Sequence, residues 1–347
     1  MTSVSVIIKA LNEELHIAGA IESTLAALAR IGGGEVVVAD GGSTDATVAI
    51  ASRYPVKLVQ LERRQDARCG AGPQLGFQHA RGRYICLIDG DMELAPGFLP
   101  AALDALATNA ALAGVSGQVE ERNLESLEYV RRTRRQPADM RAGEVDRLNG
   151  GGLYRRQAIE AAGYLSDRNL HGHEEFDLAV RLRAMGWRLQ RLPVPFVGHH
   201  GHTTGAYKLL LRRWRSRYLA GSGEVLRASL GRPHFAATLR GLPEIRLWVA
   251  VIGSWLVAAG WLTAAPGIGS AAVGLAAVML GPVALMSWRT GSVGIGTYSV
   301  VAWHLHSLGF LFGLLRPRIA PAEPLASRVL QSEGGERMER RSAHVTR

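Results

Sequence analysis

The sequence has little cysteine and no leader-like start. Cys69 and Cys86 are the two cysteines among 347 residues, which excludes a disulfide framework and a cysteine metal site. The chain opens on polar residues and enters the apolar run "VSVII" at once, unlike the charged and then apolar pattern of a signal peptide. We therefore expect reduced thiols and a first half of the chain that stays in the cytoplasm.

The sequence has fewer acidic than basic residues. The chain has 30 acidic and 40 basic residues, nearly all of the latter arginine, and a formal net charge of +10. Such a chain can bind nucleic acid, an anionic membrane or phosphorylated ligands. No nucleic-acid recognition motif is present, and basic residues gather at 208–234 with Trp214 and Tyr218, so nucleic acid is disfavoured. This stretch is typical of an interfacial membrane segment, although a solvated basic helix would explain it equally well.

Charged residues are absent from long runs after residue 245. Residues 247–265 and 267–288 contain none, and each run is long enough to cross a bilayer. The turn at Pro266 favours a transmembrane hairpin over 247–288 rather than a buried helical pair. A third uncharged run, 290–315, contains His304 and His306 and ends at Arg316. It is a third span, an interfacial segment or a re-entrant one. Three spans would oppose the positive-inside tendency, because the arginine-bearing tail would then lie on the far side.

The chain before residue 245 alternates strand-like and helix-like stretches. Runs 4–10, 35–40 and 84–89 are rich in β-branched residues, and a stretch of helical periodicity lies between the first two. This order predicts parallel βαβ units, which bind ligands at the carboxyl ends of their strands. The expected parts are an α/β domain over 1–220, a basic juxtamembrane segment over 221–246, a transmembrane region over 247–315 and a polar, mobile tail over 316–347.

Two strand ends carry carboxylates. "YICLIDGD" ends on Asp89 and Asp91, separated by one glycine. Two carboxylates this close repel unless a cation lies between them, and a hard ion such as Mg²⁺ or Mn²⁺ completes its shell with diphosphate oxygens. "VVVADGGSTDAT" ends on Asp40 and Gly41, where a carboxylate can accept hydrogen bonds from a base or ribose. No dinucleotide or P-loop fingerprint is present.

Two later motifs carry acids and histidines. "HGHEEFDLAVRL" places Glu174, Glu175 and Asp177 at the start of a helix. Acids there are stabilised by the helix dipole, but three are more than capping needs. One of them can instead be a general base. "VGHHGHT" contains His199, which is either a surface histidine or a ligand completing a carboxylate metal site.

The order of these motifs resembles family 2 glycosyltransferases of the GT-A fold over residues 3–220. "VSVIIKALNEE" is similar to the opening strand of that family with its asparagine–glutamate pair, here Asn12 and Glu13. "LNGGGLYRRQAIEAAGYL" looks like its acceptor-side loop and helix. The resemblance implies a Rossmann-like, mostly parallel sheet that binds a nucleotide sugar.

The resemblance also implies roles for single residues. Asn12 and Glu13 would belong to the donor-binding site. Asp40 would contact the base or ribose beside Gly41, and Asp89 would hold the nucleotide sugar and the metal. Asp91 and His199 would bind the metal, and Glu175 would be the catalytic base, flanked by Glu174 and Asp177.

The sequence departs from the family pattern at three places. Lys9 and Leu11 replace a proline and a tyrosine, "CGAGPQLG" replaces an alanine–arginine–asparagine run, and Leu210 stands where processive members have glutamine. The last change argues against processive polymer synthesis.

The expected function is metal-dependent, inverting transfer of a hexosyl group from a nucleoside-diphosphate donor, a UDP-sugar, to a hydroxyl of a membrane-associated acceptor. The acceptor would be lipid-linked or a saccharide in polysaccharide or glycolipid synthesis, at the inner membrane with the catalytic domain in the cytoplasm. One alternative is a polyprenyl-phosphate sugar synthase. An alternative of another class is a membrane-anchored sugar-nucleotide binder without catalysis.

Overall fold

A computed structural model describes residues 3–122, 140–201 and 204–332. The chain forms two compact units. The first comprises Met1–Leu170, Glu174–Thr203 and Arg318–Arg347, and the second comprises His171–His173 and Thr204–Pro317. The boundary expected at residue 220 therefore differs from the observed division, because the basic helices after residue 204 pack with the apolar helices.

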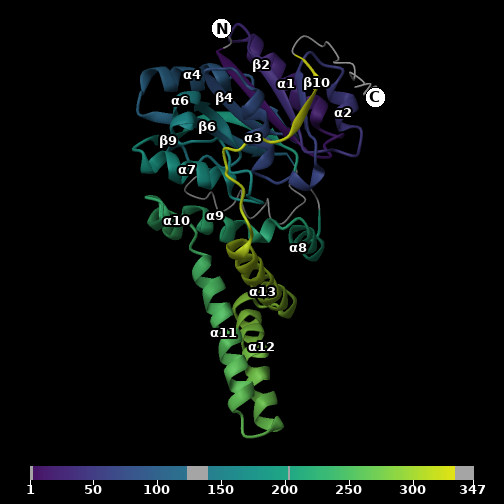
Figure 1. Cartoon of the computed structure of the whole chain (residues 1–347), viewed down its shortest axis with the longest axis vertical. Helices are drawn as coiled ribbons and strands as arrows, with labels where there is room; N and C mark the ends of the chain where they lie inside the picture. The colour runs from purple at the N-terminus through teal and green to yellow at the C-terminus, as the bar shows by residue number, and fades with distance from the viewer. Residues whose placement is uncertain (1–2, 123–139, 202–203, 333–347) are drawn as a thin grey trace, which may run out of the picture. The chain divides into compact units, whose positions relative to one another are not determined.

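The first unit is built on one mixed sheet, which contains ten strands among the described residues (Figure 1). Neighbouring strands are hydrogen-bonded in the order β10-β3-β2-β1-β4-β8-β6-β9-β5. The remaining strand, β7, pairs with β9 outside this order. The strands are β1 (Val4–Ala10), β2 (Glu35–Asp40), β3 (Lys57–Leu61), β4 (Tyr84–Asp89), β5 (Met92–Leu94), β6 (Leu112–Glu121), β7 (Gly143–Glu144), β8 (Gly152–Arg155), β9 (Arg188–His199) and β10 (Ser327–Gln331).

The predicted strands 4–10, 35–40 and 84–89 are confirmed as β1, β2 and β4. β1 lies between the other two and is parallel to both. The prediction of parallel βαβ units is therefore confirmed for this half of the sheet. β8 is antiparallel to β4 and β6, which makes the sheet mixed.

Helices cover both faces of the sheet because successive strand residues point to opposite sides. Val6 and Ile8 face a core shared with α1 (Ile17–Ala29), α2 (Thr47–Ala51) and α4 (Phe98–Thr108). Ile7 faces a second core, which is shared with α3 (Ala71–His79), α6 (Arg156–Ala161) and α7 (Glu174–Ala184). A short 3₁₀ turn, η1 (Arg64–Asp66), precedes α3.

The chain returns to this sheet at its C-terminal end. β10 pairs antiparallel with the edge strand β3, so that Arg328 lies opposite Gln60 (Figure 1, yellow strand). The backbone N–H of Ile319 donates to the side chain of Asn169 (2.9 Å), and Arg318 forms an ion pair with Asp167. The expected mobile tail thus differs from the structure over 318–332. Residues 333–347 lie outside the described residues.

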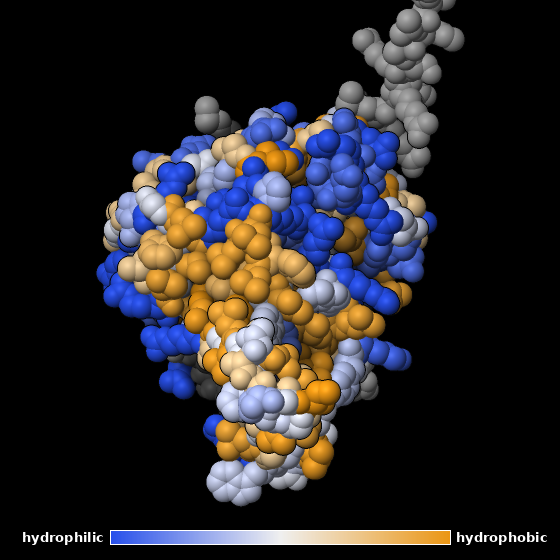
Figure 2. Space-filling view, turned by 60° about the horizontal axis from the view of Figure 1, so that its bottom comes forward, coloured by the Kyte–Doolittle hydropathy of each residue, from blue (hydrophilic) through white to orange (hydrophobic). Residues whose placement is uncertain are grey.

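The second unit is helical. Its elements are α8 (Ala206–Arg215), η3 (Tyr218–Ala220), α9 (Gly221–Ser229), α10 (Phe235–Gly241), α11 (Ile245–Ala264), α12 (Ile268–Thr290) and α13 (Val293–Leu315). Among the described residues, α11, α12 and α13 are long and apolar enough to span a membrane. No residue of α12 is buried, and Figure 2 shows hydrophobic residues at the surface of the part that comes forward. The predicted hairpin 247–288 corresponds to α11 and α12.

Candidate functional site

The candidate site lies where β1, β2 and β4 end side by side. Ala10 is in register with Asp40 on β2, and Lys9 is in register with Asp89 on β4. The carboxyl ends of parallel strands meet at one edge of a sheet. The two aspartates that the sequence placed at strand ends are thereby brought to the same edge.

Asp40 is fully buried, and one of its two carboxylate oxygens accepts hydrogen bonds from the protein. Its Oδ2 accepts hydrogen bonds from the backbone N–H groups of Gly42 (2.9 Å) and Ser43 (3.0 Å) and from Nε2 of Gln60 (2.7 Å). Its Oδ1 is buried without a hydrogen-bond partner in the described part of the chain. A buried acceptor left unsatisfied costs free energy until a donor arrives. Oδ1 is therefore suited to accept a hydrogen bond from a ligand.

Asn12 and Glu13 join the loops that follow β1 and β2. The Asn12 N–H donates to Ser43 Oγ (2.8 Å), and Asn12 Oδ1 accepts from the N–H of Thr44 (2.8 Å). Asn12 has a left-handed backbone (φ 59°), which asparagine tolerates better than most residues. The Glu13 N–H donates to Thr47 Oγ1 (2.7 Å). Both residues thus shape the loops around Asp40 and Gly41.

Lys9 connects the acidic residues of two motifs. Its Nζ lies 3.1 Å from Oδ1 of Asp89 and 3.0 Å from Oε1 of Glu174, at the start of α7. Burial alone would lower the pKa of Lys9, but the carboxylates of Asp89, Glu174 and Glu175 outweigh it and raise that pKa. Lys9 is therefore a fixed ammonium ion among three carboxyl groups.

Glu175 has the properties of a general base. Burial, followed by the charge of Glu174, raises the pKa of the Glu175 carboxyl to about 7, while Lys9 partly offsets the shift. A base is most effective when its pKa lies near the working pH. Burial also raises the pKa of Asp89, against the opposing charge of Lys9 and with the charge of Asp91 adding to the rise.

Asp91 and His199 form a second group at the end of β9. His199 Nε2 lies 3.3 Å from Oδ2 of Asp91, and its Nδ1 lies 2.6 Å from Oε2 of Glu121. Burial would lower the pKa of His199, but hydrogen bonds to both carboxylates raise it to about 10. Burial would raise the pKa of Asp91, yet the bond and charge of His199 lower it. In this arrangement His199 is an imidazolium ion bridging two acids.

The metal prediction is tested by the donors present. Among the residues that the structure describes, no three histidine, cysteine, aspartate or glutamate side chains form a group that could hold a metal ion. Asp91 Oδ1 is nevertheless buried without a hydrogen-bond partner in that part of the chain, and Mg²⁺ is commonly held by one or two carboxylates together with substrate phosphates. Asp89 and Asp91 fit such an ion. His199 fits only if Nε2, the ring nitrogen that faces Asp91, gives up its proton while Nδ1 keeps its contact with Glu121.

Asp177 is not brought to the base. Its Oδ2 accepts a hydrogen bond from Nε of Arg181 (2.9 Å), one turn further along α7. Arg181 also donates to the carbonyl groups of Ala162 and Tyr164. The structure therefore places Asp177 in a buried ion pair that ties α7 to the preceding loop.

Sequence reasoning missed three parts of this site. The contacts of Lys9 had one visible signal, a lysine inside the apolar strand "VSVIIKA". Glu121 lies at the end of β6 and has no motif of its own. Gln60 and Arg328 have no motif either. Gln60 contacts Asp40 from the neighbouring strand, and Arg328 contacts Gln60 through strand pairing across 268 residues of sequence.

Comparison with known proteins supports this picture. Residues 5–163 match the family described as "Glycosyl transferase family 2". A dodecaprenyl-phosphate galacturonate synthase from Rhizobium johnstonii is 31% identical over 109 residues, which is 29% of this chain and 32% of that protein. The match thus spans about a third of the length of that relative.

Two solved structures match the chain at low sequence identity, and the first of them is similar in fold. The mannosyltransferase PcManGT from Pyrobaculum calidifontis, in complex with GDP-Man and Mn²⁺, is 20% identical with a TM-score of 0.59, over 90% of this chain and 87% of that one. A fragment of TarS from S. aureus is 15% identical with a TM-score of 0.49, over 97% and 99% of the two chains. The family match over residues 5–163, the mixed sheet and the strand-end carboxylates agree: this part of the chain is similar to the family 2 glycosyltransferases, and its fold is GT-A.

Proposed function

We propose that this chain transfers a sugar from a nucleoside-diphosphate donor to a membrane-associated acceptor, with inversion at the anomeric carbon. The observation that carries the proposal is the cluster of Lys9, Asp89, Glu174 and Glu175 beside the buried Asp40. A binder without catalysis has no use for a carboxyl group whose pKa is raised to about 7 by burial and a neighbouring acid.

Two carboxylate oxygens that lack a hydrogen-bond partner among the described residues, Oδ1 of Asp40 and Oδ1 of Asp91, are available to bind the donor. Asp40 Oδ1 would accept a hydrogen bond from the base or ribose, and Gly41 lets the ligand approach the backbone because it has no side chain. Asp89 and Asp91 would hold a Mg²⁺ or Mn²⁺ ion, with His199 as a ligand once deprotonated. When bound, that ion neutralises the negative charge on the departing diphosphate.

The transfer step uses the acids at the start of α7. Glu175, ionised, takes the proton of the acceptor hydroxyl while the acceptor oxygen forms a bond to the anomeric carbon. The bond from that carbon to the donor phosphate oxygen breaks on the opposite face, and the nucleoside diphosphate leaves with the electron pair. Glu174, held by Lys9, keeps a negative charge beside Glu175, which strengthens it as a base.

A polyprenyl-phosphate sugar synthase is the second candidate. The relative from R. johnstonii is named as a dodecaprenyl-phosphate galacturonate synthase, and α11, α12 and α13 are long and apolar enough to span a membrane. A phosphate acceptor is already ionised and needs no base. We place the enzyme at the inner membrane with its GT-A domain in the cytoplasm, where nucleotide sugars are made.

One experiment distinguishes transfer to a hydroxyl from transfer to a polyprenyl phosphate. The purified full chain in lipid nanodiscs is incubated with labelled nucleotide sugars and either a polyprenyl phosphate or a lipid-linked saccharide, with Mn²⁺ or with chelator. We expect label in the lipid fraction that depends on the metal. Glu175→Gln should abolish transfer to a hydroxyl and spare transfer to a phosphate, whereas Glu160→Gln, an exposed acid on α6, should change neither. Full transfer by Glu175→Gln to a saccharide hydroxyl would refute its role as the base.

A further inference from the structure

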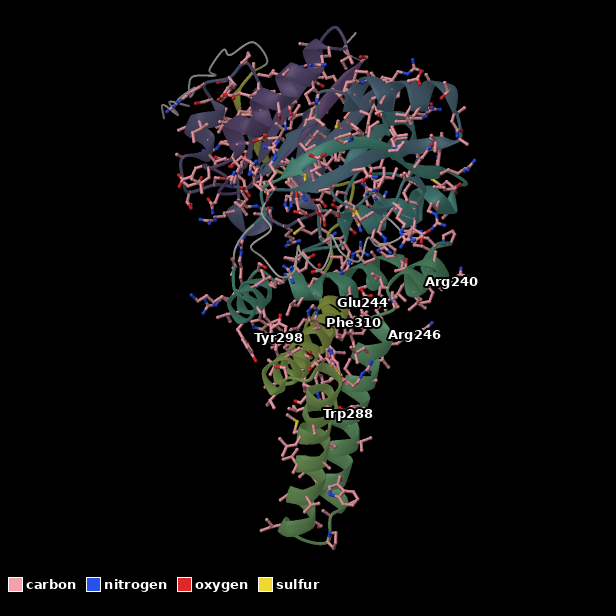
Figure 3. The ribbon with its side chains drawn as sticks, turned by 180° about the vertical axis from the view of Figure 1, so that it is seen from behind. Arg240, Glu244, Arg246, Trp288, Tyr298 and Phe310 are labelled. Atoms are coloured by element: carbon pink, nitrogen blue, oxygen red, sulfur yellow. The ribbon has the colours of Figure 1, made fainter. Side chains whose placement is uncertain are left out.

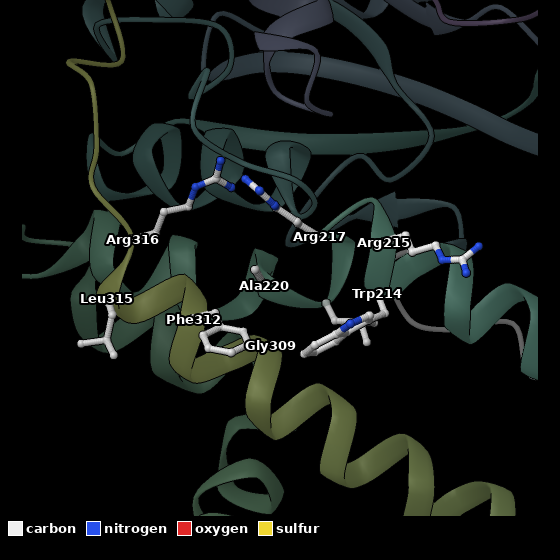
Figure 4. Close-up of a pocket in the computed structure, with 9 residues that line it drawn as sticks. Trp214, Arg215, Arg217, Ala220, Gly309, Phe312, Leu315 and Arg316 are labelled. Carbon is white, nitrogen blue, oxygen red and sulfur yellow. The ribbon is translucent and has the colours of Figure 1, made fainter. Parts of the chain in front are cut away.

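A pocket of about 580 Å³ lies within the second unit, where the C-terminal turns of α13 meet η3 and the end of α8 (Figure 4). The helices touch closely there because glycine allows it: a Cβ on Gly313 would lie 2.2 Å from the carbonyl oxygen of Ala220. The residues that line it include Trp214, Arg215, Arg217, Phe312, Leu315 and Arg316. Its volume is that of a small-molecule site.

One side of the pocket is apolar and open. The rings of Trp214 and Phe312 are 5.9 Å apart between centroids. Phe312 is 57% exposed and Leu315 is 76% exposed. Exposed apolar side chains at the end of a membrane-type helix are stabilised when lipid chains cover them.

The other side is cationic. The guanidinium groups of Arg217 and Arg316 point toward one another above the rings, whereas Arg215 points away (Figure 4). Arg316 already has an acidic neighbour, since its Nη1 lies 3.4 Å from Oε1 of Glu224. The side chain of Arg217 is exposed and has no acidic partner in the part of the chain that the structure describes. Two converging guanidinium groups repel until an anion joins them, and arginine matches phosphate oxygens with paired hydrogen bonds.

The surrounding helices indicate where this anion comes from. α8 carries Lys208, Arg212 and Arg213 in addition to the arginine of the pocket, and such a basic helix belongs at the level of lipid headgroups. α13 is apolar along its length and packs against it, with the ring of Tyr298 5.1 Å from that of Tyr207. The pocket thus joins an apolar wall to the guanidinium group of Arg217, which has no acidic partner among the described residues. This combination suits an amphiphile with an anionic head.

We propose that this pocket binds the phosphate group of a polyprenyl lipid, with the first isoprene units against Trp214, Phe312 and Leu315. The inference rests on the proposed function in one respect, namely that the acceptor is membrane-associated. It applies to a polyprenyl monophosphate and to a saccharide carried on a polyprenyl phosphate, because both carry a phosphate group next to the isoprene chain.

The test measures binding directly. The full chain is placed in phosphatidylcholine nanodiscs, and its affinity for a radiolabelled polyprenyl phosphate is compared with that for the corresponding polyprenol. We expect the wild type to prefer the phosphate and Arg217→Gln to lose about tenfold or more in affinity for the phosphate only, which is the usual effect of one charge-assisted hydrogen bond. Arg240→Gln is the matched control, an exposed arginine on α10 of the same unit (Figure 3).

Two further measurements test the apolar wall of the pocket and the folding of the variants. Phe312→Ser should weaken binding of both lipids about equally, and UDP binding should be unchanged in every variant, which shows that the GT-A domain is folded. Equal binding of polyprenyl phosphate by the wild type and Arg217→Gln would overturn the proposal, and so would its displacement by millimolar inorganic phosphate. Should the wild type bind the lipid but transfer no sugar, the proposed function fails and the lipid-phosphate site stands.

Discussion

At the scale of single residues, the raised pKa of Glu175 predicts the pH dependence of transfer. A carboxyl group acts as a base only when ionised, and burial with the charge of Glu174 raises its pKa to about 7. The transfer rate to a hydroxyl acceptor should therefore increase as the pH rises from 5 to 8, with its midpoint near 7. Single-turnover rates across that range would measure it. Glu175→Gln should lower the rate by about 10²- to 10⁴-fold and remove the inflection. A wild-type profile flat from pH 5 to 8 would contradict this role.

Lys9 should control that midpoint. Its ammonium group lowers the pKa of Glu175 and pairs with Asp89 and Glu174. In Lys9→Met the like charges of the three carboxyl groups are no longer offset, so the pKa of Glu175 should rise further. The midpoint of the rate profile should then move above 7.

Lys9→Arg is the control for Lys9→Met. It keeps the positive charge, so its profile should stay near that of the wild type even if the rate falls. An unshifted profile in Lys9→Met would show that the ammonium group has no electrostatic effect on the base.

At the scale of secondary structure elements, β10 should contribute to nucleotide binding without touching the ligand. Arg328 on β10 donates from Nε to Oε1 of Gln60 (3.0 Å), and Nε2 of Gln60 donates to Oδ2 of Asp40 (2.7 Å). Arg328 thereby fixes which end of the Gln60 amide faces Asp40. In Arg328→Met the amide can turn, and Asp40 loses a donor that holds its Oδ1 toward the ligand.

We expect Arg328→Met to weaken UDP binding by about fivefold, the effect of one net hydrogen bond. Isothermal titration calorimetry on the full chain measures it. Arg53→Met is the matched control, because Arg53 is an exposed arginine before β3 and outside this chain of contacts. If both variants bind UDP as the wild type does, β10 has only a structural role.

The same elements show how far the sequence predicts this site. β1, β2 and β4 are β-branched runs bounded by turn residues, so local propensity and pattern suffice to place Asp40 and Asp89 at adjacent strand ends. The acids at the start of α7 were also recognisable from the sequence. A catalytic role for Asp177 stays a prediction. Its partner Arg181 lies one turn away on the same helix face, and a structural ion pair and a catalytic acid look alike in sequence. β10 is five residues in a polar tail, and only the free edge of β3 makes it a strand.

At the scale of the whole molecule, the return of the chain to the sheet limits the number of membrane crossings. β10 follows the three apolar helices and pairs with β3 of the GT-A domain. Residues on both sides of the apolar region therefore belong to one folded unit. A folded unit lies on one side of a membrane, so the chain between its parts must cross an even number of times. Three crossings are excluded as long as β10 is in the sheet.

The second unit indicates which helix does not cross. No residue of α12 is buried, and α11 and α12 are joined by a short turn, as expected for a hairpin surrounded by lipid. α13 also packs against α11, where Trp255 Nε1 donates to His304 (2.8 Å). Unlike α12, it has a second set of contacts with helices that carry arginine, from Tyr298 beside Tyr207 on α8 to Gly313 against Ala220 of η3. These contacts extend over about 22 Å of helix at 1.5 Å per residue. We therefore predict that α11 and α12 cross and that α13 lies in the interface.

Single cysteines test this arrangement with a membrane-impermeant maleimide, applied to sealed vesicles of known orientation in a background where Cys69 and Cys86 are replaced by alanine. Gly267→Cys, in the turn between α11 and α12, should be labelled from the side opposite the GT-A domain. Thr290→Cys and Ala320→Cys, before and after α13, should both be labelled from the side of the GT-A domain. Thr290→Cys serves as the control, because it gives this result with either two or three crossings. Labelling of Ala320→Cys from the side of Gly267→Cys would mean that α13 crosses, and then β10 could not pair with β3, since about 30 Å of hydrocarbon would separate the two strands.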